Sequence, residues 1–356
     1  MAATINLAAL TFSADQLRQM NELVVTAVLE APELAMFHTI QTGIKNDREI
    51  GIIPGTLGLI GKAAQGCDPT ADTLLDTAVL KTWAPKRIEV IIDQCATDIA
   101  SSMAKLARKL GIEVNDLTGT EYFAFLLDLL AKDIPKMIFR HAWFGNTSVT
   151  NVSGSPAGYL TDGVSTTYFN IINGFFYQLA VLYTATAARK TAITGNSQAT
   201  YALQESVATP ALVFADINTM IDAADPILVA QPDRVLLVTH SIAKRLKRQL
   251  QTLGVAYKTE LVTAGMEIGE WDGIKMYTLP LWDQWIRAYE DNGTKYNNPH
   301  RAVYTTVSNL NIGMEGTTLF DNVNSFYDKK SRVNRIEVSD AFDAKIIDDR
   351  LFQMGL

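Results

Sequence analysis

The sequence around Ser241 carries the one arrangement that could serve nucleophilic chemistry. A short apolar run at residues 233–239 is followed by His240 and Ser241, where a helical pattern begins. A serine at such a strand-to-helix turn is the nucleophile of one large class of hydrolases, but that turn needs flanking glycines. Those positions hold Thr239 and Ala243. Because serine is also a preferred helix cap, we expect Ser241 to cap the helix over residues 241–253.

Other chemistry-bearing residues are scattered. The histidines, none with a partner at metal-ligand spacing, are His38, His141, His240 and His300. The two cysteines, Cys67 and Cys95, form no disulfide framework and are expected to stay reduced. The sequence holds no phosphate-binding or dinucleotide-binding glycine motif. We therefore expect no catalytic residue, no metal site and no cofactor.

Charge and composition narrow the class further. The chain has 356 residues, 48% of them hydrophobic, enough for one large core or two modest ones. A net charge of −7 argues against a protein that coats nucleic acid by neutralising phosphates. The N-terminus has no positive charge before Arg18 and only a short apolar run, so neither a secretory signal nor a membrane span is expected.

Hydrophobic periodicity predicts the elements that position these residues. We expect helices over residues 13–30, 96–110, 118–140, 209–224 and 241–253, and a loop over 147–167. Residues 86–93 alternate between apolar and charged side chains, which predicts a strand. Further strands are expected at 233–239, at 267–271 and 274–277 around an Asp272-Gly273 hairpin turn, at 301–307 and at 332–347.

The order of these parts resembles the major capsid protein of tailed bacteriophages, the Hong Kong 97-like fold family. The features that carry the resemblance are the glycine-rich two-stranded excursion before the helices, the long helix over 118–140, the helix–strand–helix over 209–253 and the closing strands. The resemblance implies an α+β fold in five parts: an N-terminal arm (1–47), an extended β-hairpin loop (48–95), a peripheral domain with a long spine helix (96–165), an axial α/β domain (166–294) and the rest of the peripheral domain (295–356). Residues 48–93 are expected to make few contacts within their own subunit and many with a neighbouring one.

The resemblance also implies a function. The chain would be made in the host bacterial cytoplasm and would assemble with itself, as pentamers and hexamers, into an icosahedral virion shell. That shell would enclose double-stranded DNA without sequence-specific binding, with a portal protein, a separate scaffold and decoration proteins as partners. From charge and position, the subunit-interface candidates are Trp83, Lys86, Arg87, Lys244, Arg245, Arg248, Asp348 and Asp349.

Two other functions stay open. An encapsulin, the nanocompartment shell built on the same fold, would enclose cargo enzymes in place of DNA. A cytosolic α/β enzyme would hold a small ligand at the strand–loop–helix of residues 234–253, although the lack of convergent catalytic residues counts against it. The sequence also leaves open whether Trp271, Trp282 and Trp285 lie in the core or at a seam between subunits.

Overall fold

We describe a computed structural model of the chain. It describes residue 34 and residues 36–44, 49–52, 79–95, 121–149, 160–255, 259–263, 266–316, 322–328 and 333–356. The helices expected at 13–30 and 96–110, most of the N-terminal arm and the far part of the extended loop lie outside these residues. Within them, no helix has the length and apolarity needed to cross a bilayer.

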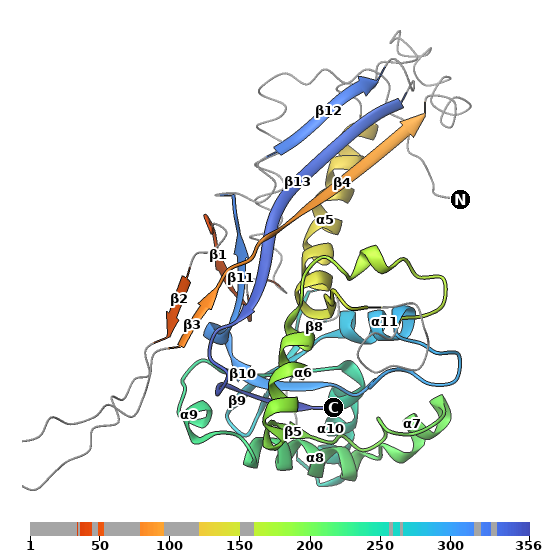
Figure 1. Ribbon diagram of the computed structural model, residues 1–356. Helices are drawn as coiled ribbons and strands as arrows, with labels where there is room; N and C mark the ends of the chain where they lie inside the picture. The colour runs from red at the N-terminus through yellow and green to blue at the C-terminus, as the bar shows by residue number, and fades with distance from the viewer. Residues whose placement is uncertain are drawn as a thin grey trace, which may run out of the picture.

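A seven-stranded mixed sheet forms the centre of the lower body in Figure 1. Its strands, in spatial order, are β5 (Lys190–Thr191), β14 (Phe352–Gly355), β10 (Ala302–Thr306), β6 (Arg234–Val238), β9 (Ile274–Thr278), β8 (Met266–Trp271) and β7 (Thr259–Thr263). The predicted hairpin between β8 and β9 is confirmed, since both turn residues have positive φ, 50° at Asp272 and 73° at Gly273. This geometry suits an Asp-Gly turn.

Helices cover both faces of this sheet. The first face packs against α5 (Glu121–Phe144), α6 (Phe175–Ala185) and α11 (Pro280–Tyr289), and the second against α8 (Pro210–Asp222) and α10 (His240–Thr252). The side chains of the central strand β6 alternate between the two faces. Val235 and Leu237 lie in the core on the first face, and Leu236 and Val238 lie in the core on the second. A strand buried on both faces is apolar at every position, which explains the continuous run in the sequence.

A second, five-stranded sheet rises beside α5 (Figure 1). It is organised around β13 (Val333–Ile346), which pairs along one edge with β4 (Lys86–Cys95). Along its other edge it pairs with β12 (Asn322–Asp328) and then with β11 (Leu310–Met314), which in turn pairs with β1 (Thr39–Gln41). The closing strand predicted at 332–347 is therefore confirmed, and it holds this sheet together.

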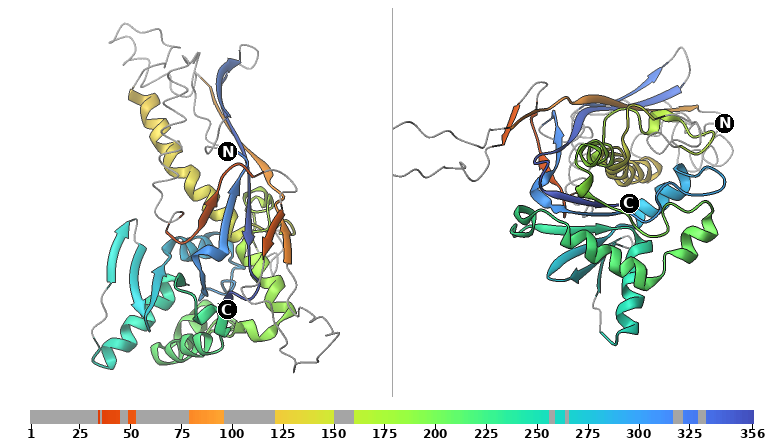
Figure 2. Two further views of the ribbon diagram at one scale, coloured as in Figure 1. Left: turned by 90° about the vertical axis from the view of Figure 1, so that its left-hand side faces the viewer. Right: turned by 60° about the horizontal axis from the view of Figure 1, so that its bottom comes forward.

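The extended loop is only partly separate from the subunit. Strands β2 (Glu49–Ile52) and β3 (Val79–Thr82) form a two-stranded hairpin at the edge of the molecule (Figures 1 and 2). In contrast, β4 pairs with β13 over ten residues and is part of the subunit's own sheet. The expectation that residues 48–93 make few contacts within their own subunit was therefore wrong for residues 83–93, because their apolar face is buried at Trp83 and Ile88.

Aromatic residues dominate the core between α5, α6 and α11. Trp143 lies with its ring centroid 4.6 Å from that of Trp282 and 5.0 Å from that of Phe175. His38 joins the cluster by stacking on Phe175, and its Nε2 accepts a hydrogen bond from the Trp143 indole at 2.9 Å. Trp271, Trp282 and Trp285 are all buried, which answers the open question of their position: they belong to the core of the subunit.

Candidate functional site

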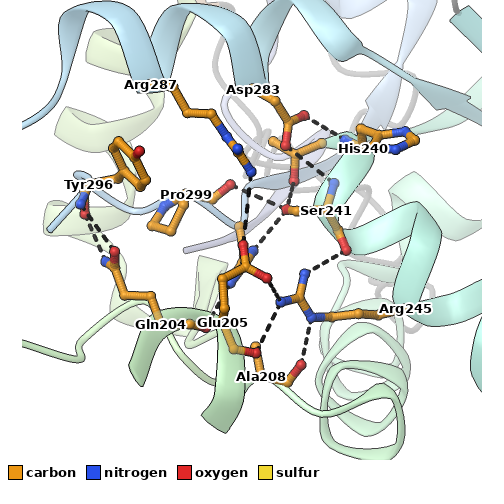
Figure 3. A network of polar contacts seen from close by, with 12 residues as sticks. Gln204, Glu205, Ala208, His240, Ser241, Arg245, Asp283, Arg287, Tyr296 and Pro299 are labelled. Carbon is orange, nitrogen blue, oxygen red and sulfur yellow. Dashed lines mark hydrogen bonds and ion pairs between the residues drawn. The ribbon is translucent and has the colours of Figure 1, made fainter. Parts of the chain in front are cut away.

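The strand-to-helix turn after β6 lies in a buried polar network (Figure 3). The Ser241 hydroxyl is 2.8 Å from Nδ1 of His300, which lies two residues before the start of β10. On the other side of the imidazole, Nε2 is 3.2 Å from the carbonyl oxygen of Gln204 in α7 (Tyr201–Val207). From the sequence alone, Ser241 was set aside as a nucleophile. Because the fold places a histidine beside it, the geometry of this pair decides whether it can do chemistry.

His300 is held as a neutral imidazole. Burial, together with the positive charge of Arg245, lowers the pKa of His300 to about 4. A neutral imidazole has one donor and one acceptor nitrogen, and the carbonyl of Gln204 can only accept. Nε2 therefore carries the proton, and Nδ1 accepts from the Ser241 hydroxyl. This is the tautomer that a general base would need.

The surroundings of the pair do not fit nucleophilic catalysis. A nucleophilic serine at a helix start needs free backbone amides nearby to bind the oxyanion. Here Asp283 of α11 accepts hydrogen bonds from the amides of His240 at 2.6 Å and Ser241 at 3.2 Å. The next amide, that of Ile242, donates to the Thr239 carbonyl at 3.1 Å. With Ser241 only 8% exposed and His300 fully buried, the pair is a structural link.

The hydrogen bonds to Asp283 also correct the cap that was expected for the helix over residues 241–253. Ser241 lies in the first turn of α10, and Thr239 takes the N-cap position without a side-chain capping bond. The carboxylate of Asp283 caps the helix in its place, from a different helix. Burial raises the pKa of Asp283, and the two amide hydrogen bonds act in the opposite direction. A carboxylate is well suited to this position because it also complements the positive end of the helix dipole.

Arg245 belongs to the same network and not to the outer surface. Its Nε donates to the Ala208 carbonyl at 2.5 Å and its Nη1 to the Ser241 carbonyl at 2.8 Å, while Nη2 lies 2.6 Å from the Glu205 carboxylate. Partial burial alone would raise the pKa of Glu205, but the surrounding positive charges, with Arg245 and its hydrogen bond foremost, lower that pKa overall. The prediction that Arg245 is an interface residue was therefore wrong. Its position three residues after the buried Ile242, on the same side of α10, was the available signal.

The other basic candidates are distributed differently. Lys244 and Arg248 are exposed on α10, and neither forms an ion pair with a described residue. Lys86 is also exposed, and Arg87 donates from Nη2 to the Ser339 hydroxyl at 3.0 Å across the β4–β13 pair. These four residues remain available for contacts between subunits.

The remaining candidates are engaged within the subunit. Asp348 pairs with Arg350 at 3.0 Å, and Asp349 pairs with Lys81 at the base of the β2–β3 hairpin. Trp83 is 1% exposed, so it packs in its own subunit's core and is not free to enter an interface. The structure thus does not bring the basic and acidic candidates together in one place.

Two amide side chains that the sequence analysis missed complete the network. Gln204 donates from Nε2 to the Tyr296 carbonyl at 2.8 Å and accepts from the Tyr296 amide at 3.0 Å. Asn196 forms the same reciprocal pair with the backbone of His300, at 2.7 Å and 2.9 Å. Each side chain mimics a neighbouring strand for the segment over residues 296–300. No local pattern marks these residues, because their partners lie about a hundred positions away in the sequence.

A buried ion pair lies beside this segment. Arg301 pairs with Glu290, and its guanidinium lies over the rings of Phe176, at 4.8 Å, and Phe144, at 5.3 Å. Burial raises the pKa of Glu290, against the opposing effect of Arg301. Among the described residues, no group of three or more histidine, cysteine or carboxylate side chains could hold a metal ion.

Comparison with known proteins gives the fold class. No family model matches the sequence, and no curated protein matches it. Among solved structures, the capsid of an empty GTA particle is similar over 100% of this chain and 94% of that one, with 9% identity and a TM-score of 0.50. The satellite phage P4 procapsid with its Sid protein (12% identity, 96% and 97% coverage, TM-score 0.48) and the SrpI encapsulin complex of Synechococcus elongatus PCC 7942 (10%, 100% and 91%, 0.49) are also similar.

The protein therefore has the fold of a capsid shell protein. The resemblance to phage major capsid proteins that the sequence suggested is confirmed at the level of the fold. The mixed α+β class is confirmed with it.

Proposed function

We propose that this chain is a major capsid protein, a structural subunit that assembles with copies of itself into a closed icosahedral shell around double-stranded DNA. The observation that carries the proposal is the similarity, over the whole chain, to the capsid of a GTA particle. The blocked amides beside Ser241 support a structural role for the turn that most resembled an active site.

Under this proposal the architecture maps onto the parts of a shell subunit. The β2–β3 hairpin is the base of the extended loop, α5 is the spine helix beside the β4–β13 sheet, and the seven-stranded sheet with its helices is the axial domain. The exposed Lys86, Arg87, Lys244 and Arg248 contribute to contacts between subunits. A portal protein, a separate scaffold and decoration proteins would be the partners in the virion.

Electron microscopy of the purified chain, expressed alone and with a candidate scaffold, tests the proposal. Closed shells of uniform diameter are the expected result. Small monodisperse oligomers under both conditions would contradict it and favour a cytosolic enzyme. Shells that co-purify with a host enzyme and without nuclease-protected DNA would identify an encapsulin.

A further inference from the structure

A groove lies between the base of the β2–β3 hairpin and helix α6. It has a volume of about 490 Å³. Leu80 and Lys81 of β3 form one wall, and Tyr177 and Val181 of α6 form the other, with Asp343 of β13 among the residues between them. The two walls are thus more than ninety residues apart in the sequence and meet only in the folded subunit.

Both walls present large apolar side chains to solvent. Leu80 is 61% exposed and Val181 is 54% exposed. Exposed apolar side chains that gather at one concave surface mark contact sites more often than those scattered singly over a protein. The groove is therefore a candidate contact surface.

The groove is already formed in the single subunit. From one wall, Lys81 donates to the Ile346 carbonyl at 2.8 Å and pairs with Asp349. From the other wall, Gln178 donates to the Ala344 carbonyl at 2.6 Å and accepts from the Ile346 amide at 3.1 Å. Both walls are thus fixed to the same end of β13, so a partner would not need to order them on binding.

The charges at the rim indicate the chemistry of the occupant. Lys86 is exposed and forms no ion pair with a described residue, whereas Lys81 and Lys345 pair with Asp349 and Asp343. The rim therefore keeps an uncompensated positive charge, while the chain as a whole carries −7. An apolar segment with carboxylates at its edge would complement the groove, and another copy of this acidic chain can supply one.

We propose that the groove between β3 and α6 receives an acidic, apolar segment of a second copy of this chain. The proposal rests on the proposed function, since it names one contact through which subunits assemble. The groove of one copy cannot be filled by the same groove of another copy, so the contact must join two different surfaces of the chain. Contacts of this heterologous kind repeat around closed rings, which suits a subunit that forms pentamers and hexamers.

Photo-cross-linking from Leu80 tests which molecule occupies the groove. With p-benzoylphenylalanine in place of Leu80, irradiation of assembled particles should give covalent dimers of the chain, and irradiation of unassembled subunits should give none. A cross-link to a different protein, or particles without any cross-link, would overturn the proposal and leave the shell function intact. If the unaltered chain forms no particles at all, the proposed function itself fails.

A matched pair of valines provides a second test. Val181→Asp places a charge in the groove, and Val255→Asp places one at a residue of similar exposure, 52%, just after α10 and outside the groove. Both variants should melt like the parent. Val181→Asp should lower particle yield at least tenfold, and Val255→Asp should leave it within twofold. Equal yields for the two variants would contradict a role for the groove.

Discussion

The indole of Trp83 lies where a side chain at residue 313 would have to be. A β-carbon built on Gly313 of β11 comes within 2.8 Å and 2.9 Å of the indole ring and within 2.6 Å of Cδ1 of Ile44. Only a residue without a side chain allows Trp83 to close over β11 at the joint between the hairpin and β4. This close approach explains why Trp83 serves the fold of its own subunit.

Gly313→Ala should therefore destabilise the subunit by about 1–3 kcal/mol, the usual cost of overpacking a well-packed core. Urea unfolding of the unassembled subunit measures it. In a Trp83→Leu background the same substitution should cost less, because the smaller side chain leaves room for the methyl group. Additive effects of the two substitutions would show that the residues are not coupled.

Replacement by methionine at two arginines of α10 should affect two different properties, stability in one case and assembly in the other. Arg245→Met leaves buried carbonyl groups without donors, so it should lower the free energy of unfolding by about 1–3 kcal/mol. Arg248→Met alters an exposed side chain and should change stability by less than about 0.5 kcal/mol. The Arg248 variant should instead reduce particle yield in electron micrographs. A stable Arg245 variant would contradict the network in Figure 3.

The stability of the subunit should fall with acidity in a defined window. The folded state lowers the pKa of His300 from 6.5 to about 4. The contribution of His300 to the free energy of unfolding is therefore full above about pH 6.5, and it is lost as the pH falls towards 4. The shift corresponds to about 3 kcal/mol at most. Burial lowers the pKa of His141 to about 3, so it acts in the same direction. Thermal melts from pH 7 to 4 should show a shallower decline for His300→Gln than for the parent.

Removing the cap on α10 should loosen the link between two helices. Asp283→Ala leaves the amides of His240 and Ser241 without an acceptor, which should cost about 0.5–2 kcal/mol. Asp283→Asn keeps an oxygen acceptor and should cost less. Chemical denaturation of both variants measures the difference. Equal losses would mean that the negative charge of the carboxylate, which both variants remove, matters more than the oxygen acceptor that the asparagine variant keeps.

Charge reversal at Arg87 should separate assembly from folding. Arg87 is exposed, and its single hydrogen bond to Ser339 is only partly buried, so that bond should contribute about 0.5–1.5 kcal/mol. Arg87→Glu should therefore lower particle yield far more than it lowers the melting temperature of the unassembled subunit. Equal losses in both measurements would assign the residue to the fold, and unchanged yield would place the subunit edge elsewhere.

Local patterns predicted those parts of the fold that local chemistry determines. The Asp272-Gly273 turn and the entry of α8 at Thr209, whose hydroxyl accepts from the Leu212 amide, were both readable from neighbouring residues. The cap of α10 was not, because its acceptor, Asp283, lies more than forty residues away. The end of the extended loop was misplaced for the same reason. Alternation predicted β4 as a strand, but its pairing with β13 depends on residues some 250 positions later.

The place of β14 in the seven-stranded sheet has a consequence for biosynthesis. Strand β14, residues 352–355, lies between β5 and β10 and pairs with both. The ribosome therefore makes more than 150 residues after β5 before β14 exists. Until then one edge of β10 has no partner, and an open strand edge can pair with other nascent chains. The fold must therefore be completed late in synthesis, when a chaperone or rapid closure by β14 would protect the growing chain from aggregation.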